Sequence, residues 1–583
     1  MKYLLFVILL LAAVLRLYGL DRGDTVNDEV FYAFRAIGML DFDKAPEQTT
    51  PLEWYNPNIP WWTKLSFHDH PPLVFWVQHF FMKVFGDSRW AFRLPSAILG
   101  IISVWLVYLI GRKLFSQNAG LLSAALFAVT LNNVYISRTG MQESYVIFFM
   151  LLASYFFLKN YFVWTGVILG LAFLTKYNTF ILAPIFLVYL LIYRRDIFYN
   201  KKFWLGALLA LIIFSPVIIY NYEMYRSVGH FDFQLSYIFG QNTPEWQSAP
   251  GKEIGTVGER MQNFIPRLVA TNSWLFLALF AISLFFLRNI FLFFMFVFLF
   301  LLLMLIGPSY RFLTMLTPWM ALSVGMFFQT GGHYLSAGLM RRSGDGLWRC
   351  LRAGLARVAG KDRAKQESVA APPRTSLAGA SEESKKALPN GIISIILVAI
   401  LVFEIFYSYN NQIAYYPNGA ERAPWLASKV RYENYNWGYN ELNDYLEKEL
   451  SGKMPALTFY PKYQFLNKLQ DEVLAKDQAK NLEPYPALLV YYGNINDGPR
   501  LWTFDRLRFY RAWSIITFDT YGQFLKENGP DYYKKTGFKN YYFILGADTT
   551  QSAEFQQAIW GAEPELIKNK RGDIVFKVYK FVL

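Results

Sequence analysis

Long apolar runs dominate the first 330 residues, and polar residues fall mostly in the short segments between them. The runs are too continuous for a soluble core, in which apolar positions recur with the period of a helix or a strand. Because about 20 apolar residues are needed to cross the hydrocarbon layer, the pattern predicts eleven transmembrane helices. Since the fourth to the sixth are short or closely spaced, the count is open by two. They are expected at 2–20, 94–111, 118–136, 144–158, 161–175, 178–193, 203–222, 271–288, 290–306, 312–330 and 391–410.

Lysine and arginine residues between the predicted helices indicate their orientation. With a cytoplasmic N-terminus, every short basic cluster and the long stretch 341–386 lie inside, and the odd number of helices places the C-terminal region outside. The opposite orientation would translocate all of these charges, against the positive-inside tendency. One alternative stays open for the first helix. Met1-Lys2 and the apolar run after it also fit a signal peptide, although no small-x-small cleavage site precedes Asp21.

After residue 410 the composition changes to that of a soluble domain. Strand-like runs at 487–492, 514–518, 541–545 and 574–582, with a helical pattern at 439–450, predict an extracytoplasmic α/β domain over 411–583. The stretch 331–390 is rich in Gly, Ala, Ser, Arg and Lys, and is expected to be a mostly disordered cytoplasmic linker. The predicted fold class is therefore a polytopic α-helical membrane protein with a C-terminal α/β domain.

Composition and charge agree with this division. Of the 583 residues 54% are hydrophobic and 17% charged, against about 25% charged in an ordinary soluble domain. The net charge of +14 lies largely in the predicted inside segments, so we interpret it as an orientation signal, and no nucleic-acid partner is expected. The single cysteine, Cys350, excludes an intramolecular disulfide and a Cys-rich zinc site.

The first outside loop, residues 21–93, carries acidic residues directly after the first helix. Asp24 and the run Asn27-Asp28-Glu29 place carboxylates at a membrane surface, where they can deprotonate a nucleophile or hold a divalent cation. A solvated helix cap is the alternative interpretation of the same residues.

A second motif in this loop is His68-Asp69-His70-Pro71-Pro72, followed by an apolar stretch at 74–85. That stretch is short for a membrane span, and we expect an interfacial helix with a proline-defined start. The two histidines are candidate metal ligands, although two histidines at this spacing also suit an ordinary turn.

Three short outside turns each supply a cation: Arg138, Lys176 and Arg311. Glu143 lies close to the first of them in the chain, and an acid and a base between two spans favour a polar cavity. Guanidinium binds phosphate oxygens bidentately and lysine adds a point charge. Snorkelling to lipid headgroups explains any single cation equally well, but three cations with a carboxylate pair indicate group transfer from a lipid phosphate.

The order of these motifs resembles the membrane-embedded GT-C glycosyltransferases of the protein O-mannosyltransferase and aminoarabinose lipid A transferase type. The resemblance covers residues 1–330 and, besides the motifs above, includes 15–20, 170–176 and 310–313 ahead of Pro318. It implies a polyprenyl-phosphate sugar donor and transfer with inversion on the extracytoplasmic face. It also implies that Asp28, with Glu29 beside it, is the catalytic base, and that Glu143 is the acid of the second loop.

The same resemblance assigns the other candidate residues. Arg138, Lys176 and Arg311, with Tyr310 beside the last, are expected near the donor phosphate, and His70 near the acceptor or as a positioning residue of the loop. The sequence predicts no specific cofactor, and a divalent metal stays an alternative, with Asp28, Glu29 and His70 as its candidate ligands. The expected partners are the polyprenyl-phosphate sugar, a lipid, protein or glycan acceptor, and membrane lipids.

Two competing functions differ in their sequence features. Oligosaccharyltransferases carry a Trp-Trp-Asp motif in their soluble domain, whereas residues 434–438 here read Asn-Tyr-Asn-Trp-Gly, which disfavours transfer to asparagine. A transporter or flippase of a lipid-linked saccharide would also have many spans with cations and acids. Transporters often contain inverted repeats, which we do not find here, and the acids of this chain gather at one surface. The sequence leaves the sugar and the acceptor open.

Overall fold

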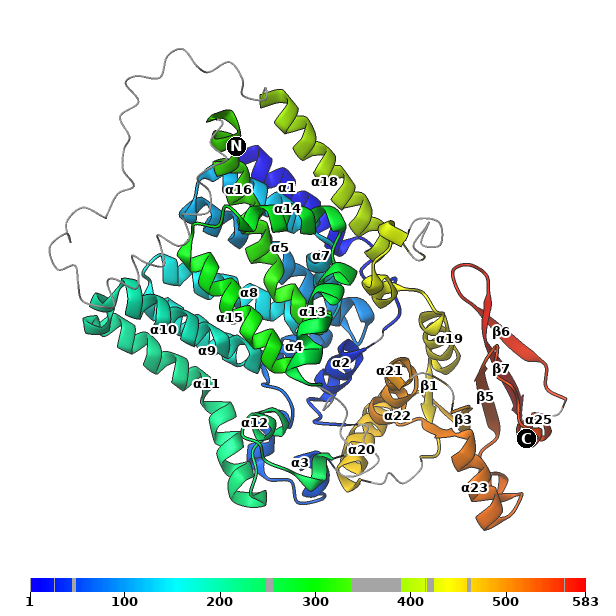
Figure 1. The fold of residues 1–583 in the computed structure, drawn as a ribbon. Coiled ribbons are helices and arrows are strands. Elements are labelled where there is room, and N and C mark those ends of the chain that lie inside the picture. Colours follow the sequence, from blue (N-terminus) through cyan, green and yellow to red (C-terminus); the bar gives the residue numbers. More distant parts are fainter. Residues whose placement is uncertain are drawn as a thin grey trace.

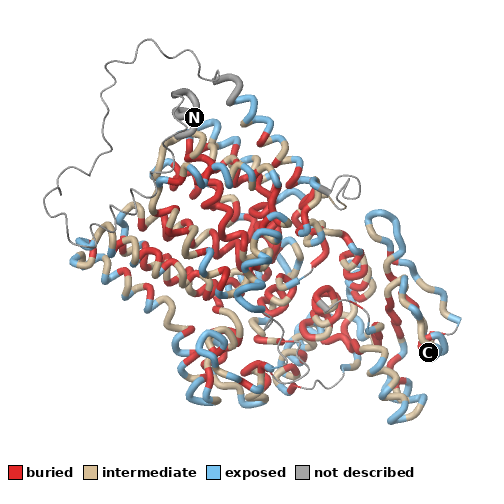
Figure 2. The backbone as a smooth tube through the Cα atoms, in the orientation of Figure 1, coloured by how far each residue is buried: buried red, intermediate tan, exposed pale blue. Residues whose placement is uncertain are grey.

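The structure is a computed structural model that describes residues 2–25, 27–43, 49–247, 255–337, 390–414, 416, 424–458, 463–493, 495, 497–559 and 561–582. Helices from the first two thirds of the chain form a bundle, and a smaller domain with a β-sheet lies beside it (Figure 1). The buried residues concentrate in the centre of the bundle and in the sheet, whereas the peripheral helix α11 (Lys201–Val228) is largely exposed (Figure 2). Exposed apolar side chains on outer helices are typical of a surface that faces lipid.

Each predicted span coincides with a helix or with two adjoining helices. The helices are α1 (Lys2–Leu17), α5 (Arg89–Leu114), α6 (Gln117–Val129) with α7 (Leu131–Arg138), α8 (Glu143–Leu158), α9 (Phe162–Phe173), η2 (Tyr177–Ile181) with α10 (Leu182–Tyr193), α11, α14 (Trp274–Leu284), α15 (Ile290–Ile306), η5 (Phe312–Leu316) with α16 (Thr317–Ala337), and α18 (Asn390–Gln412). Among the described residues, four helices are long and apolar enough to cross a membrane, or five if the pair α6–α7, bent by 58°, is one span. The other helices on these positions are shorter.

Helices in the bundle approach closely where glycines face each other. A Cβ atom on Gly166 of α9 would lie 1.9 Å from the carbonyl oxygen of Gly206 on α11, and one on Gly206 would lie 2.3 Å from the carbonyl oxygen of Phe162. Small residues at such positions let helix backbones pack directly in a membrane, where lipid competes for larger apolar side chains. A side chain at either position would therefore separate α9 from α11.

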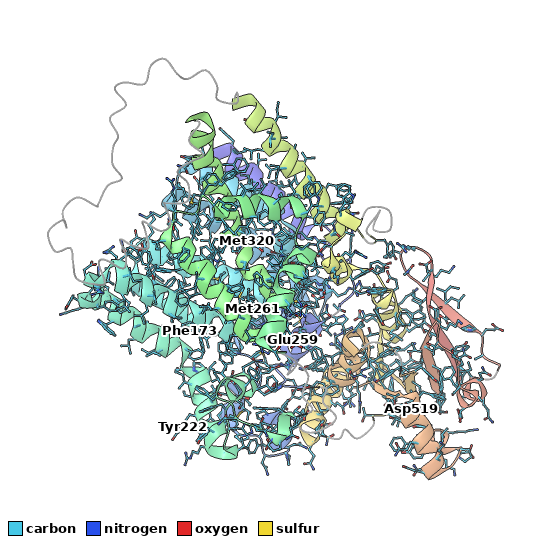
Figure 3. The ribbon with its side chains drawn as sticks, viewed as in Figure 1. Phe173, Tyr222, Glu259, Met261, Met320 and Asp519 are labelled. Atoms are coloured by element: carbon cyan, nitrogen blue, oxygen red, sulfur yellow. The ribbon has the colours of Figure 1, made fainter. Side chains whose placement is uncertain are left out.

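The sequence pattern did not predict α13 (Val257–Thr271), an amphipathic helix that packs beside α15. A capping box formed by Thr256 and Glu259 begins it. Figure 3 labels Glu259 and Met261 on this helix, and Met261 belongs to an exposed apolar row. Its moderate hydropathy and mixed charges explain why a search for continuous apolar runs did not find it.

The first outside loop folds into short helices against the bundle. The predicted interfacial helix is α4 (Leu73–Phe85), which begins after the two prolines and packs against α2 (Asp28–Gly38) and α5. The other short elements near this loop are α3 (Pro51–Trp54), η1 (Trp61–Lys64), α12 (Phe233–Ile238) and η4 (Pro244–Trp246). A separate short helix, η3 (Arg195–Tyr199), joins α10 to α11.

The C-terminal domain is built on a mixed five-stranded sheet in the order β4-β3-β5-β7-β6. Strands β3, β4 and β5 are parallel, and β7 pairs antiparallel with both β5 and β6. All four strand-like runs and the helical pattern of the sequence are present, as β3 (Ala487–Tyr491), β4 (Ser514–Thr517), β5 (Asn540–Gly546), β7 (Ile574–Val582) and α19 (Tyr439–Leu450). The edge strand β6 (Pro564–Lys568) was not predicted, because most of its residues are exposed and it lacks a long apolar run.

The other elements of this domain pack around the sheet or pair beside it. They are η7 (Pro424–Leu426), η8 (Lys429–Asn434), β1 (Lys453–Pro455), α20 (Gln464–Ala479), β2 (Glu483–Tyr485), α21 (Asp497–Arg500), the π-helical turn η9 (Leu501–Asp505), α22 (Arg506–Tyr510), α23 (Phe518–Asn528), α24 (Tyr532–Lys535) and α25 (Ala553–Ala558).

The two parts of the molecule share a hydrophobic core. Side chains of α2 and α4 pack with Trp502, Phe509 and Tyr510 of the C-terminal domain, and the Tyr510 hydroxyl donates a 2.7 Å hydrogen bond to the carbonyl oxygen of Phe34. The C-terminal domain therefore supports the helix that begins at Asp28.

The predicted linker at 331–390 needs a correction at its edges, because α16 continues to Ala337 and α18 begins at Asn390. Residues 338–389 lie outside the described part of the chain.

Candidate active site

Four charged side chains from four separate connections meet at one place. Asp28 and Glu143 are the first residues of α2 and α8, and Lys176 and Arg311 directly precede η2 and η5. Arg311 forms an ion pair with Asp28, Lys176 Nζ lies 2.6 Å from Glu143 Oε1, and Arg311 Nε lies 3.9 Å from the same oxygen. We call these four residues the charged cluster. It joins the predicted base, the predicted second-loop acid and two of the three predicted cations.

The charged cluster has a buried side and an open side. The side chains of Glu143 and Lys176 are 1% and 8% exposed, whereas those of Arg311 and Asp28 are 25% and 40% exposed. The Phe312 ring packs against both cations, with its centroid 4.8 Å from Lys176 Nζ and 5.1 Å from Arg311 Cζ. Each distance allows a cation–π attraction to the ring. A ligand from solvent would therefore first meet Asp28 and Arg311.

The helix start and the neighbouring cations stabilise the charged form of Asp28. It stands at the N-terminus of α2, where the helix dipole favours a carboxylate. Burial raises the pKa of Asp28, but the Arg311 guanidinium, with Lys176 and His70, holds that pKa below its ordinary value of 3.8. Asp28 is therefore ionised at neutral pH and can accept a proton.

The candidate site extends beyond the charged cluster along one face of α2. Tyr32, one helical turn after Asp28, lies with its hydroxyl 3.4 Å from Asp28 Oδ2 and 3.5 Å from His70 Nε2. His70 Nδ1 lies 3.0 Å from Asp69 Oδ1, which also accepts a 2.7 Å hydrogen bond from Arg35. Neither Tyr32 nor Phe312 was predicted from the sequence. The i, i+4 spacing from Asp28 was the signal that could have identified Tyr32.

Glu29 occupies a different environment from Asp28. Successive side chains of a helix point about 100° apart. Glu29 forms a fully buried ion pair with Arg93, in which Arg93 Nη2 lies 2.5 Å from Glu29 Oε1 and Arg93 Nε lies 3.0 Å from Glu29 Oε2. Its Oε2 also accepts a 2.8 Å hydrogen bond from the Gly140 amide. The structure therefore places Glu29 as a connection between α2, α5 and the second outside loop, apart from the charged cluster.

Arg138 and Tyr310 are likewise not brought into the charged cluster. The Arg138 guanidinium donates to the carbonyl oxygens of Leu15, Arg16, Tyr18 and Gly19, at 2.7 to 3.2 Å, and so caps the C-terminal end of α1. The Tyr310 ring lies 5.9 Å from the guanidinium carbon of Arg267. Neither placement could be read from the chain, since the partners are distant in sequence.

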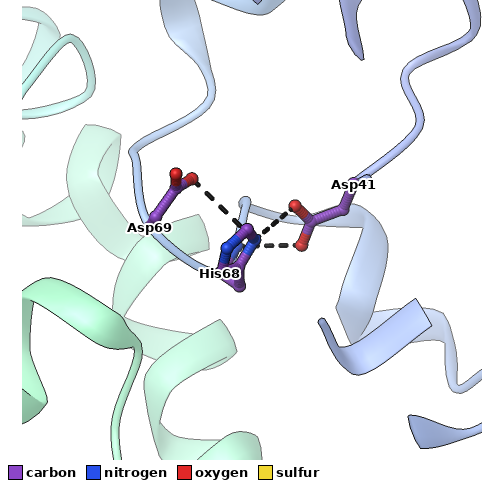
Figure 4. A group of neighbouring side chains, drawn as sticks. All are labelled: Asp41, His68 and Asp69. Carbon is purple, nitrogen blue, oxygen red and sulfur yellow. Dashed lines mark hydrogen bonds and ion pairs between the residues drawn. The ribbon is translucent and has the colours of Figure 1, made fainter. Parts of the chain in front are cut away.

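Within the described residues, the group that could hold a metal ion consists of Asp41, His68 and Asp69, not of Asp28, Glu29 and His70. Ligand atoms of these three lie within 4.8 Å of one another (Figure 4). His68 Nδ1 lies 2.7 Å from Asp41 Oδ1, and its Nε2 lies 3.4 Å from Asp43 Oδ2. Burial lowers the pKa of His68, but the Asp69 and Asp41 carboxylates raise it well above 6.5. Asp41 is thus paired with His68, and Asp69 with Arg35, so these residues form an ion-pair network.

Comparison with known proteins agrees with the resemblance seen in the sequence. Residues 69–220 match the family model of dolichyl-phosphate-mannose-protein mannosyltransferase. A Bacillus subtilis (strain 168) protein named "Putative mannosyltransferase YycA" is 31% identical over 217 residues, which are 36% of this chain and 30% of that protein. The undecaprenyl phosphate-alpha-4-amino-4-deoxy-L-arabinose arabinosyl transferase of Wigglesworthia glossinidia brevipalpis is 23% identical over 163 residues, 26% of this chain and 29% of that protein. The matched segments thus span about a third of these relatives.

The fold is similar to that of a solved structure. The crystal structure of ArnT from Cupriavidus metallidurans bound to undecaprenyl phosphate aligns with 99% of this chain and 97% of that chain, at a TM-score of 0.51 and 15% identity. The similarity extends from the helical bundle through the C-terminal domain. The resemblance found in the sequence is therefore confirmed: the chain matches a mannosyltransferase family model over residues 69–220 and is similar in fold to ArnT.

Proposed function

We propose that the chain is an integral membrane glycosyltransferase that transfers a sugar, with inversion, from a polyprenyl-phosphate donor to a hydroxyl acceptor. The observation that carries the proposal is the charged cluster, in which an ionised, partly exposed carboxylate lies beside two cations. The undecaprenyl phosphate bound to ArnT and the mannosyltransferase family match support the donor class.

The proposed reaction is a single displacement. The acceptor oxygen forms a bond to the anomeric carbon while the bond from that carbon to the phosphate oxygen breaks, and Asp28 takes the hydroxyl proton. Arg311 and Lys176 stabilise the negative charge that builds on the departing polyprenyl phosphate. The Glu143 carboxylate holds Lys176 by an ion pair, and the Phe312 ring makes cation–π contacts with both cations.

We propose that the reaction takes place on the extracytoplasmic face. Glu143 begins α8 and Lys159 follows its end, so the charged cluster and a predicted inside residue lie at opposite ends of one helix. By the positive-inside tendency the cluster then faces outward, together with the C-terminal domain. A membrane-impermeant thiol reagent should leave Cys350 unlabelled in intact cells, and labelling there would reverse this orientation.

The experiment that tests the function uses the purified full chain in detergent or liposomes. Polyprenyl-phosphate sugars labelled in the sugar are supplied with candidate lipid, peptide and glycan acceptors, and labelled product is followed by mass spectrometry. Transfer that requires Asp28 and Arg311 supports the proposal. Movement of the donor across liposome membranes without any glycosylated product would favour a flippase instead.

A further inference from the structure

Glu433 of the C-terminal domain contacts the residue that precedes the proposed base. Its carboxylate, in η8, accepts a hydrogen bond from the side-chain amide of Asn27, 406 residues earlier in the chain. Asn27 is the N-cap residue of α2, but its side chain makes no capping hydrogen bond to that helix. The side chain that would ordinarily cap the first turn of α2 is thus directed to the C-terminal domain.

The backbone of Asn27 is in an unfavourable conformation. Its φ of 58° and ψ of −158° lie in a region that residues with a side chain rarely occupy. Such a conformation persists only where surrounding contacts hold it. Because Asp28 directly follows, the backbone conformation of Asn27 affects the direction in which the Asp28 carboxylate leaves the chain.

Further contacts connect the same two segments. The Asp24 carboxylate accepts hydrogen bonds from the backbone amides of Trp437, Gly438 and Asn440, at 2.5, 3.0 and 2.9 Å, and so caps α19. A Cβ atom on Gly23 would lie 2.6 Å from the Asn434 Cα atom. Gly23, Asp24 and Asn27 therefore contact residues 433–440 shortly before the chain reaches Asp28.

The charges around Glu433 belong largely to the active-site region. Asp28 and Glu29 on α2 and Arg311 before η5 act on it electrostatically, and Glu433 in turn acts on Tyr135 of α7. Burial, together with the two α2 carboxylates, raises the pKa of Glu433 to about 7. The Glu433 side chain is half-buried, and its carboxylate is turned toward Asn27.

We propose that Glu433 is a positioning residue of the active site: by holding Asn27 it sets the orientation of Asp28, so that docking of the C-terminal domain is a condition for transfer. This inference rests on the proposed function. It gives the C-terminal domain a role in the chemical step, through the first turn of α2, separate from any role in binding the acceptor.

The test compares Glu433→Ala, Glu433→Gln and Asn27→Ala in the full-length enzyme. Glu433→Ala should lower kcat about tenfold to a hundredfold, because small displacements of a reacting group cost that much in rate, with KM for the donor changed less than about twofold. Glu433→Gln keeps an oxygen that accepts the Asn27 hydrogen bond, so its kcat should stay within about threefold of wild type. The double variant Asn27→Ala/Glu433→Ala should be no slower than the slower single variant, since both remove one interaction.

The matched control is Glu472→Ala, the same change at an exposed position of α20 in the same domain, which should leave kcat unchanged. Wild-type kcat in Glu433→Ala, or multiplied losses in the double variant, would overturn the inference. A loss in Glu433→Ala that Glu433→Gln does not recover would also overturn it. Absence of transfer by wild type itself would instead contradict the proposed function.

Discussion

Asp28 and Arg311 form an ion pair across 283 residues of sequence, at the open side of the charged cluster. The proposed base and the cation proposed to bind the phosphate are thus in direct contact. A phosphate would compete with the Asp28 carboxylate for the guanidinium, because both are anions that arginine binds bidentately. Donor binding should therefore release Asp28 to accept a proton, which favours an order in which the donor binds first.

Replacement of the base should separate binding from chemistry. Asp28→Asn removes the proton acceptor at nearly constant size, so turnover should fall by about 10² to 10⁴. Donor affinity should stay equal or increase, because Arg311 loses its competing carboxylate. Turnover and equilibrium binding of the donor lipid check the two effects. The control is Asp87→Asn, which changes a carboxylate 3.5 Å from Arg511 and outside the cluster. Near wild-type turnover in Asp28→Asn would remove the base from the mechanism.

Two arginines that the sequence analysis assigned to one role should behave differently. Arg311→Ala should weaken donor binding and slow transfer, because the guanidinium would contact the phosphate in ground and transition states alike. Arg138→Ala should instead leave several buried carbonyl oxygens without a donor and lower the free energy of unfolding by on the order of 3 kcal/mol. Thermal unfolding in detergent beside donor binding distinguishes them. A stable Arg138→Ala with weakened donor binding would return Arg138 to the phosphate site.

Glu29 should affect stability more than the chemical step. Glu29→Gln leaves the Arg93 charge buried without its counterion, and breaking such a pair typically costs about 3–5 kcal/mol. We expect a lower Tm and poor yield. The double variant Glu29→Gln/Arg93→Met should recover part of both, because no charge is then left buried. An equally stable Glu29→Gln that loses turnover would argue that Glu29 takes part in the reaction.

Removal of divalent metal should change the transfer rate less than about twofold. The carboxylates of Asp41 and Asp69 already have cationic partners in His68 and Arg35, and a metal would require a neutral imidazole. Turnover after treatment with EDTA, compared with samples given back Mg²⁺, Mn²⁺ or Zn²⁺, checks this. Loss of activity that one of these ions restores would assign a metal to the enzyme.

The stability of the protein should depend on pH through Glu433. Its pKa is raised from 4.5 to about 7 on folding, so the folded state binds this proton more tightly than the unfolded chain. The free energy of unfolding that it contributes therefore falls as pH rises from about 5 to 7. Glu433→Gln cannot lose a proton and should be more stable than wild type at pH 8, with a smaller difference at pH 5. A difference in Tm that is the same at both pH values would contradict this expectation.

The sequence alone predicted the positions of the helices and of four sheet strands. Continuous apolar runs and strand-like patterns are local properties, and they coincide with α5, α11, β3, β5 and β7. The charged residues at the outer helix ends were also visible as motifs, because polar residues between apolar runs stand out in a membrane protein. The amphipathic α13 and the exposed edge strand β6 lacked such a run and were not predicted.

Only the tertiary structure decided which of those motifs act together. Asp28 and Glu29 are neighbours in the chain, but successive residues of a helix point in different directions. Asp28 therefore pairs with Arg311, and Glu29 pairs with Arg93. Arg138, Lys176 and Arg311 are equivalent in the sequence, but Arg138 caps α1, whereas the other two join the charged cluster. The contact between Asn27 and Glu433 spans most of the chain. Partner choice among charged groups depends on distances and burial that chain folding sets, and no local pattern records them.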